Sequence, residues 1–370
     1  MRGPLLVSAG EPSGDRIASM TLRVLTDSRA DLHPFGMGGD GCAGSGMDVV
    51  VPLANVATMG WLPVAGQAWA LQRAFRTVLS EARRRRPSLA LLVGFTSFHQ
   101  ALGRRLRALG VRVLWCVAPQ VWAWRPSRLS TLRRSVDRLA VLFPFEEPLW
   151  RRHGYDVRYV GHPAVELTTA RGAGELPRRL AVLMGSRVQE VRATAGPFLE
   201  AARTWQRDNA DWEVHAVVSP ALPARWERWL MQRLEAAGLR CVMADRRVGA
   251  APRMQEYGLA LCASGTACLE AAISGVPPVI GYRCDAFSAF VARRLLLTRH
   301  IGLPNIVLGE RAFPELVQRD LRADRVVAAL SCLRDDEGAR TACGRVREIL
   351  ELDDGLSFGD RVARMLAEMA

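Results

Sequence analysis

The feature that most constrains the fold is a regular alternation of short apolar runs with longer amphipathic stretches. The runs expected to form strands are residues 5–8, 89–93, 112–117, 139–143 and 157–160, and then 180–184, 213–218, 240–244, 258–262 and 278–280. The stretches expected to form helices include 16–26, 67–86, 101–109, 193–209 and 224–237. Apolar strands that alternate with helices are typical of parallel sheets covered on both faces.

This strand–helix series occurs twice, and a polar, glycine-containing segment near 161–174 separates the two copies. We therefore predict an α/β fold of two facing Rossmann-like domains, with ligands in the cleft beyond the carboxyl ends of the strands. The predicted division is 1–165, 166–355 and a C-terminal helix within 356–370 that packs back on the first domain.

The formal net charge of +13 comes from 50 basic and 37 acidic residues, and every basic residue is an arginine. This excess favours anionic partners such as phosphorylated substrates or an anionic membrane face. Nucleic acid is not expected, because the sequence has no zinc finger, RNP-like motif or basic tail.

Three further properties of the sequence bear on its compartment. The eight cysteines form no CxxC pair, which favours reduced, buried thiols over a metal site or disulfides. No segment reaches the ~18 apolar residues of a membrane span. The first residues lack the long apolar region of a secretory signal, so we expect a cytoplasmic protein.

Two glycine-rich segments lie in the first half. Residues 8–15 (SAGEPSGD) join a predicted strand to a predicted helix, which brings backbone close to a polar ligand or is a plain turn with Ser13 or Asp15 as the N-cap. Residues 36–41 (GMGGDG) fit GxGxxG, but we predict no helix after them and find no acidic strand end about twenty positions on. A nicotinamide site is therefore not expected.

Two loops in the second half have the composition of a diphosphate site. Gly185, Ser186 and Arg187 follow the predicted strand 180–184, and the small residues 264–267 follow 258–262, with Glu270 beyond. Backbone N–H groups at a helix start and an arginine suit phosphate, and a carboxylate suits ribose hydroxyls. The alternative is ordinary helix capping by Ser264 and a surface Glu270.

Two aromatic segments accompany these loops. Residues 115–125 (WCVAPQVWAWR) interleave tryptophan with apolar residues and end in arginine, and residues 61–71 form an apolar patch that precedes four arginines at 83–86. Such segments suit sugar stacking, an acyl chain or attachment to anionic lipid. Core packing with a solvated arginine run is the alternative.

Taken in order, these segments resemble the lipid-A-disaccharide synthase family over essentially the whole chain. The most specific matches are the segments 8–15 and 119–125, and further ones are 36–39, 59–60, 143–146, 160–163, 185–191, 263–270, 281–283 and 303–305. The resemblance implies two Rossmann-like domains of the GT-B type and metal-free, inverting transfer of 2,3-diacylglucosamine from UDP to 2,3-diacylglucosamine 1-phosphate. The expected product is a β-1,6-linked disaccharide, and no cofactor is expected.

The resemblance also implies the site residues. UDP is expected at Gly185, Ser186, Arg187, Ser264, Gly265, Thr266, Glu270 and Asn305. The acceptor side is expected to be lined by Gly10, Ser13, Gly14, Met59, Gly60, Gln120, Trp122, Trp124 and Arg125.

One departure from the family concerns catalysis. Where the family carries a catalytic aspartate after the strand 89–93, this chain has Gly94, and Ser97 replaces a second carboxylate. His99 in the same loop is the first candidate for the base, with Glu11 or Asp15 as substitutes, because general base assistance is worth roughly 10²–10⁴-fold. The alternative is that His99 only packs in place of the family's asparagine.

The missing aspartates leave two alternatives to the family reaction. One is a non-catalytic protein that binds a UDP-sugar or an acylated sugar, and the other is a transferase with a different acceptor or a UDP-N-acetylglucosamine epimerase. The expected partners are the UDP-sugar, the acylated glucosamine phosphate, the anionic inner membrane face and a second copy of the chain.

Overall fold

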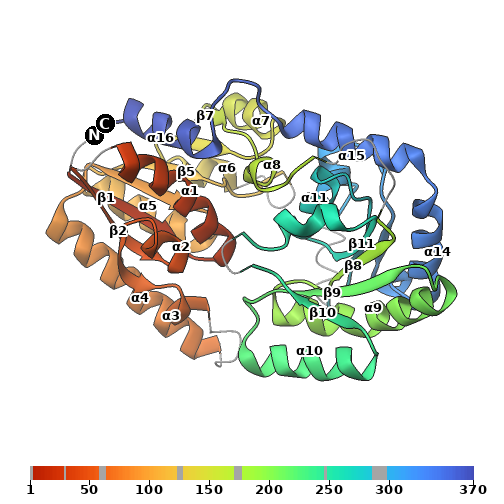
Figure 1. Ribbon diagram of the computed structural model, residues 1–370. Helices are drawn as coiled ribbons and strands as arrows, with labels where there is room; N and C mark the ends of the chain where they lie inside the picture. The colour runs from red at the N-terminus through yellow and green to blue at the C-terminus, as the bar shows by residue number, and fades with distance from the viewer. Residues whose placement is uncertain are drawn as a thin grey trace. The chain divides into compact units, whose positions relative to one another are not determined.

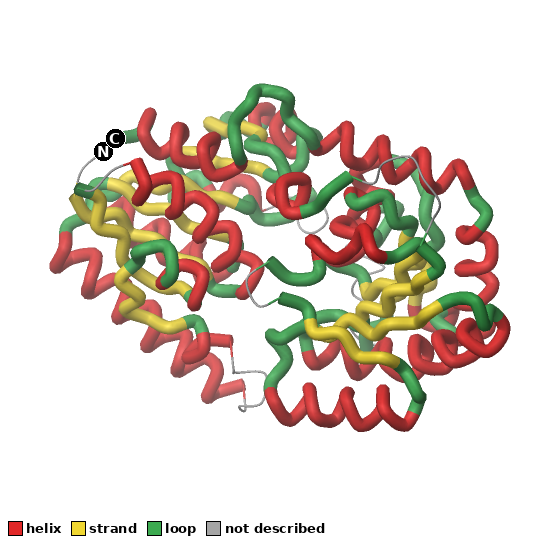
Figure 2. Tube along the Cα trace, viewed as in Figure 1, coloured by secondary structure: helices red, strands yellow, loops and turns green. Residues whose placement is uncertain are grey.

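The chain divides into two compact units in this computed structural model, which describes residues 3–28, 31–57, 64–122, 128–170, 177–245, 248–285 and 298–370. Unit 1 comprises Met1–Pro163 with Leu352–Ala370, and unit 2 comprises Ala164–Glu351. Each unit is a parallel sheet flanked by helices (Figures 1 and 2). None of the helices in the described segments has the length and apolarity needed to cross a membrane.

The sheet of unit 1 has seven parallel strands in the order β3-β2-β1-β4-β5-β6-β7. The strands are β1 (Gly3–Ala9), β2 (Leu32–Gly38), β3 (Asp48–Pro52), β4 (Leu89–Val93), β5 (Arg112–Cys116), β6 (Arg138–Val141) and β7 (Asp156–Tyr159). The helices are α1 (Pro12–Ser28), α2 (Asp40–Ala43), α3 (Ala54–Ala57), α4 (Val64–Arg85), α5 (Thr96–Ala108), α6 (Arg128–Leu132), α7 (Glu146–Arg152) and the C-terminal α16 (Phe358–Glu368).

The core of unit 1 explains why its central strands are apolar at every position. All five residues of β4 are buried, because helices cover both faces of the sheet. On one face, Val78 of α4 and Leu102 of α5 join Leu92 and Trp115 in a single apolar cluster. Helix α1 packs against α16, so the end of the chain completes the unit that its beginning forms (Figure 1).

Unit 1 differs from the sequence-based prediction in the strands β2 and β3, which were not predicted, and in the helix α2. The strand β2 was not predicted, because Pro34 and two glycines, Gly36 and Gly38, interrupt its pattern. Gly36 lies so close to β1 that a Cβ there would be 1.9 Å from the carbonyl oxygen of Val7. We predicted no helix after the 36–41 segment, but the short helix α2 begins there, at Asp40. It is only four residues long, and the side chain of Asp15, which is remote in sequence, caps it.

The sheet of unit 2 has six parallel strands in the order β10-β9-β8-β11-β12-β13. They are β8 (Arg179–Leu183), β9 (Glu213–Val218), β10 (Arg240–Met243), β11 (Leu259–Ala263), β12 (Pro278–Tyr282) and β13 (Glu315–Val317). The helices from α8 on are α8 (Pro163–Leu167), α9 (Val188–Asp208), α10 (Ala224–Ala236), α11 (Thr266–Ile273), α13 (Leu303–Leu308), α14 (Ala323–Arg334) and α15 (Glu337–Leu350), with 3₁₀ turns at Ala251–Glu256 and Gln318–Asp320.

Candidate functional site

In each sheet, the strand order reverses between two neighbouring strands, and the glycine-rich loops follow those strands. In unit 1 the reversal lies between β1 and β4, which precede Gly10 and Gly94. In unit 2 it lies between β8 and β11, which precede Gly185 and Ser264. Loops that diverge at such a switch point leave a crevice for a ligand at the carboxyl ends of the strands.

The loops after β1 and β4 are in close contact in unit 1. A Cβ at Gly10 would be 2.1 Å from the Cδ1 atom of Phe95, so only glycine fits under that ring. Gly94 and Phe95 are both left-handed, with φ of 60° and 48°. For phenylalanine this conformation is strained, and such strain clusters at functional sites.

Glu11 lies beside Gly94, the position at which the resemblance to the family implies an aspartate. Its Oε1 atom is 3.9 Å from where a Cβ at Gly94 would stand. Glu11 is half-buried at the start of α1, next to the carboxyl end of β1. A carboxylate of this chain therefore lies 3.9 Å from where a side chain at position 94 would begin, although it comes from the loop after the neighbouring strand β1.

His99 is completely buried and uses both ring nitrogens inside unit 1. Its Nε2 atom is 2.9 Å from Ser8 Oγ, and its Nδ1 atom is 2.7 Å from the carbonyl oxygen of Gly94. Burial lowers the pKa of His99 to about 4. This environment favours the packing interpretation of His99, because a base must reach the proton that it removes.

Asp15 has a bonding pattern that explains its place in the glycine-rich segment. Its carboxylate accepts hydrogen bonds from the backbone N–H groups of Gly39 at 2.6 Å, Gly41 at 2.9 Å and Cys42 at 3.2 Å. The segments 8–15 and 36–41 are thus joined through one side chain, which also stabilises the start of α2. Asp15 caps α2 and lies inside α1, instead of capping α1.

The remaining predicted site residues of unit 1, which are the catalytic candidate Ser97 and the acceptor-side residues, differ in exposure. Ser13 in the first turn of α1 and Ser97 in the first turn of α5 are exposed, and Gln120 after β5 is exposed as well. Gly14 is buried, and a Cβ on it would be 3.3 Å from the carbonyl oxygen of Val93. Met59, Gly60, Trp124 and Arg125 lie outside the described residues.

Trp122 connects the tryptophan motif to a buried acid. Its Nε1 atom donates a 2.9 Å hydrogen bond to Glu146 Oε1, and Glu146 Oε2 accepts from the N–H groups of Leu142 and Phe143. Glu146 is 2% exposed, and burial raises its pKa to about 7. The Trp122 ring also contacts the Phe145 ring edge-on, with centroids 5.2 Å apart.

The role of Glu146 was missed by the sequence analysis, although its motif was recognised. The one available signal was an acid directly after the apolar run 139–145. Its function here is to hold the ring of Trp122 beyond the carboxyl ends of β5 and β6, because it is the acceptor of the indole N–H.

The apolar patch before the arginine run falls mainly on α4. Trp69 is 63% exposed, and the guanidinium of Arg73 lies 5.7 Å from its ring centroid. Arg84 and Arg85 both form ion pairs with Glu81. The arginine run is therefore partly neutralised, and residues 58–63 lie outside the described part of the chain.

In unit 2, the loop after β8 is arranged around Glu190. Gly185 has φ of 103°, and a Cβ on it would be 2.6 Å from Glu190 Oε2. Glu190 accepts hydrogen bonds from the N–H groups of Ser186 at 3.1 Å and Arg187 at 3.2 Å, and from the Arg187 guanidinium at 2.8 Å. A carboxylate thus occupies donors of the kind that bind phosphate.

The loop after β11 begins the buried helix α11. Ser264 Oγ donates to the carbonyl oxygen of Ile301 at 3.1 Å, and Gly265 is the N-cap of α11 with no side-chain cap. Thr266 is exposed in the first turn, whereas Glu270 on the same helix is 4% exposed. The first turn of α11 therefore presents backbone N–H groups, the arrangement that favours an anion.

Asn305 is fully buried at the start of α13, and its amide is used inside unit 2. It donates to the carbonyl oxygen of Phe313 and to Glu315 Oε1, and it accepts from the N–H of Phe313. Glu315 in turn accepts from the N–H groups of Ile301 and Gly302. Asn305 thus fixes the segment that contacts Ser264.

Metal-binding side chains do not gather in the described segments, which contain no group of three or more His, Cys, Asp or Glu residues placed to hold an ion. The described cysteines are all free thiols, and Cys42, Cys116, Cys262, Cys268 and Cys343 are buried.

Comparisons with known proteins give the family. The family model described as lipid-A-disaccharide synthetase matches residues 5–355. The lipid-A-disaccharide synthase of Koribacter versatilis is 32% identical, with 99% of this chain and 98% of the relative covered, and that of Geobacter sulfurreducens is 33% identical, with 99% and 97% covered. The crystal structure of Acinetobacter baumannii MurG has a TM-score of 0.60 at 12% identity over the full length of both chains, which shows a shared GT-B fold. The chain belongs to the lipid-A-disaccharide synthase family.

Proposed function

We propose that this protein transfers 2,3-diacylglucosamine from UDP to the 6-hydroxyl of 2,3-diacylglucosamine 1-phosphate, with inversion to a β-1,6 linkage. The observation that carries this proposal is the continuous family match from residue 5 to residue 355, which includes the loops at both switch points. The net charge of +13 suits two phosphorylated substrates.

Glu11 is the proposed catalytic base. Among the four candidates, the imidazole of His99 is enclosed, and the carboxylate of Asp15 caps α2. Ser97 offers only an alcohol, which is a poor proton acceptor at neutral pH. Glu11 is the candidate carboxylate nearest to the missing aspartate's position, and it is half-buried at the carboxyl edge of the sheet. It would take the proton of the acceptor hydroxyl as the oxygen attacks the anomeric carbon, while UDP leaves.

Unit 2 is the proposed donor domain. The UDP diphosphate is assigned to the N–H groups of Ser186 and Arg187, the Arg187 guanidinium and the first turn of α11 at Gly265 and Thr266. These groups stabilise the negative charge that develops on the leaving diphosphate. When UDP binds, the N–H groups and the guanidinium that now donate to Glu190 would donate to the phosphate instead.

Unit 1 is the proposed acceptor domain. We propose that it binds the acceptor at the inner face of the cytoplasmic membrane. The ring of Trp122, held by Glu146, suits stacking on a sugar. The exposed Trp69 beside Arg73 suits an interface with lipid. A second copy of the chain is proposed as a partner, to be measured by sedimentation of the purified protein.

The direct test is turnover by purified protein in detergent. UDP-2,3-diacylglucosamine and 2,3-diacylglucosamine 1-phosphate are supplied together, and the disaccharide is followed by mass spectrometry. We expect disaccharide and UDP in equal amounts, and only when the acceptor is present. Binding of the UDP-sugar without product, across acyl-chain lengths and acceptors, would reject the transfer reaction.

A further inference from the structure

The carbonyl oxygen of Gly94, directly after β4, is in contact with the nitrogens of two buried rings. His99 Nδ1 lies 2.7 Å from this oxygen, and the indole Nε1 of Trp115 lies 3.2 Å from it. The N–H of Gly94 donates to the carbonyl oxygen of Cys116 at 3.0 Å. Both polar backbone groups of Gly94 are therefore fixed, and two of the three hydrogen bonds come from β5.

The position of this carbonyl determines which nitrogen of His99 carries the hydrogen. A carbonyl oxygen can only accept, so in the neutral imidazole Nδ1 is the donor and Nε2 accepts from the hydroxyl of Ser8 at 2.9 Å. Ser8 lies near the end of β1, two residues before Gly10. The network thus joins the carboxyl ends of three neighbouring strands, β1, β4 and β5.

This network holds a backbone conformation that is costly by itself. Gly94 and Phe95 have left-handed φ of 60° and 48°, and in a residue other than glycine this conformation persists only where the surrounding structure over-determines it. With this backbone, the Phe95 ring covers Gly10, 2.1 Å from where a Cβ of Gly10 would stand. Gly10 directly precedes Glu11, whose Oε1 atom is 3.9 Å from the Cβ position of Gly94. Glu11 therefore lies against the loop that the two rings hold.

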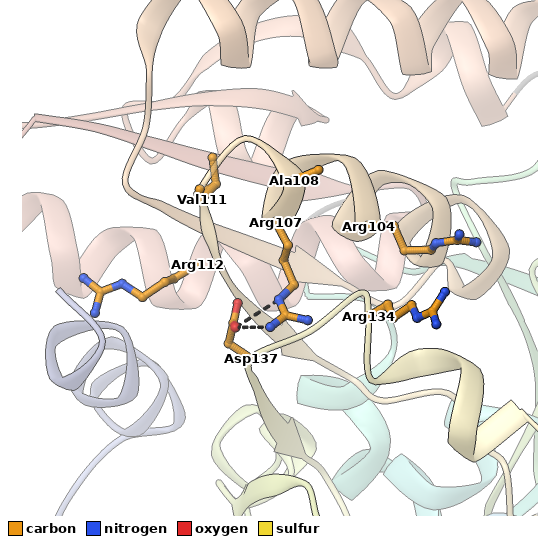
Figure 3. Close-up of a pocket in the computed structure, with 8 residues that line it drawn as sticks. Arg104, Arg107, Ala108, Val111, Arg112, Arg134 and Asp137 are labelled. Atoms are coloured by element: carbon orange, nitrogen blue, oxygen red, sulfur yellow. Dashed lines mark hydrogen bonds and ion pairs between the residues drawn. The ribbon is translucent and has the colours of Figure 1, made fainter.

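The helix and the strand that supply the two ring donors are also joined at their other ends. Beside a surface hollow between the end of α5 and the start of β5, Arg107 Nε donates to Asp137 at 3.0 Å (Figure 3). The same carboxylate accepts from the N–H of Val113 at 2.8 Å. Because α5 and β5 are connected at both ends, the indole N–H of Trp115 is presented to Gly94 from a rigid frame.

We propose that Trp115 is a positioning residue for the transfer reaction: its indole N–H holds the Gly94 carbonyl and, through the loop 94–95, sets the position of the Glu11 carboxylate. This inference rests on the proposed function of Glu11 as the base. A displacement of about 1 Å in a reacting group lowers a rate by roughly 10²-fold, so a hydrogen bond that holds the base affects kcat without touching substrate. An asparagine at position 99 still offers an N–H group, whereas a phenylalanine at position 115 offers none.

The test compares two tryptophan-to-phenylalanine variants of unit 1, at a temperature where circular dichroism shows both to be folded. Trp115→Phe removes the indole N–H from Gly94. Trp150→Phe makes the same change at another fully buried ring, in α7, whose Nε1 has no hydrogen-bond partner within the described part of the chain. We expect Trp115→Phe to lower kcat by roughly 10–100-fold with KM for the UDP-sugar within about twofold, and Trp150→Phe to keep kcat within a few fold. Equal kcat for the two variants would overturn the proposal.

The same substitution in the Glu11→Gln background shows whether Trp115 acts through Glu11. If it does, Trp115→Phe lowers kcat much less there than in the unchanged chain, because the base that it positions is already gone. The same fractional loss of kcat in both backgrounds would contradict the inference, since the substitution would then damage unit 1 in general.

Amide hydrogen exchange of the segment 94–99 separates this inference from the transfer reaction, because it needs no turnover. We expect exchange in this segment to be about tenfold faster in Trp115→Phe than in Trp150→Phe. Equal exchange in the two variants would reject the positioning role, whatever the chain catalyses. If the unchanged chain makes no disaccharide but exchange is faster in Trp115→Phe, the transfer reaction is rejected and the hold of Trp115 on the loop is supported.

Discussion

Glu11 is the residue on which the proposed chemistry depends most directly. We predict that Glu11→Gln lowers kcat by roughly 10²–10⁴-fold, because the amide cannot accept the proton of the attacking hydroxyl, while KM for the UDP-sugar changes little. His99→Asn is the matched control, since that ring is enclosed, and it should keep kcat within a few fold at a temperature where it is folded. If Glu11→Gln turns over like the unchanged chain, another base must act.

The buried His99 makes stability depend on pH. Its pKa is about 4 in the folded chain and about 6.5 when unfolded, so acidification protonates the unfolded chain first. The stabilisation is therefore complete above pH 6.5 and is lost as the pH falls to about 4. We predict a loss of roughly 3 kcal/mol from this group over that range.

The contribution of Glu146 to stability changes with pH in the opposite direction to that of His99. Variants of each residue are therefore needed to separate the two contributions. Its pKa of about 7 lies above the unfolded value of 4.5, so its contribution is greatest below pH 4.5 and is lost as the pH rises to about 7. In urea unfolding from pH 4 to 7, His99→Asn should remove a stabilisation that grows with pH, and Glu146→Gln should remove one that shrinks with pH. Parallel curves for the three proteins would contradict both assignments.

At the scale of elements, the loop after β8 and helix α9 are expected to change partners when UDP binds. We predict that Arg187→Ala weakens UDP binding by about tenfold or more, because it removes a charge-assisted hydrogen bond to phosphate. Glu190→Gln should strengthen binding several fold, since an amide competes less than a carboxylate for the same donors.

Calorimetric titration with UDP measures both effects. Arg207→Ala is the control for charge, because Arg207 lies at the far end of α9 and pairs with Asp208. Glu190→Gln binding more weakly than the unchanged chain would show that the carboxylate supports the loop in the bound state too.

Helix α16 depends on its first turn. Ser357 and Asp360 form a reciprocal capping box, in which Ser357 Oγ accepts from the N–H of Asp360 and the Asp360 carboxylate accepts from the N–H of Ser357. We predict that Ser357→Ala costs about 1 kcal/mol of stability, measured by urea unfolding. Ser331→Ala on the exposed side of α14 is the control and should change stability by less than half as much. Equal losses would mean that the cap is not responsible.

A helix or strand could be predicted from the sequence where the residues that determine it are close together in the chain. Residues 89–93 were predicted as a strand and form β4, because burial on both faces leaves a continuous apolar run. Helix α9 begins at Val188, five residues before the predicted start, because Glu190 forms the cap around Arg187 and Pro197 is tolerated inside. The strand β2 was missed because Pro34 and two glycines interrupt its apolar pattern. The contact that makes Gly36 necessary is with Val7, which is remote in sequence.

The same distinction applies to the candidate site: its loops could be predicted from local sequence, whereas its side-chain contacts could not. Loops 8–15, 185–187 and 264–266 were predicted from glycine and strand spacing, and they follow the strands at the switch points. The Ser8 partner of His99 is 91 positions away, and the partners of the Asp15 carboxylate are 24 to 27 positions away, so no local pattern revealed that both side chains are engaged within the fold. The proximity of Glu11 to position 94 likewise depends on the pairing of β1 with β4.

At the scale of the whole molecule, the chain leaves unit 1 at Pro163 and returns to it at Leu352. The returning segment contributes Glu368, which pairs with Arg138 of β6 and Arg158 of β7. Gly359 fits closely on α1, since a Cβ there would be 2.6 Å from the carbonyl oxygen of Met20. Unit 1 is therefore incomplete without the last residues, whereas unit 2 is one continuous segment.

This connectivity predicts different behaviour for the two units as fragments. Residues 164–351 should unfold cooperatively alone, whereas 1–163 should lack a cooperative transition until 352–370 is joined to it by a flexible linker, because α16 covers apolar surface of α1. Calorimetry and urea unfolding monitored by circular dichroism measure both. The joined fragment carrying Gly359→Val is the control, and it should behave like 1–163, since the larger side chain separates α16 from Met20. Equal unfolding midpoints for 1–163 with and without the C-terminal segment would show that α16 rests on unit 1 without stabilising it.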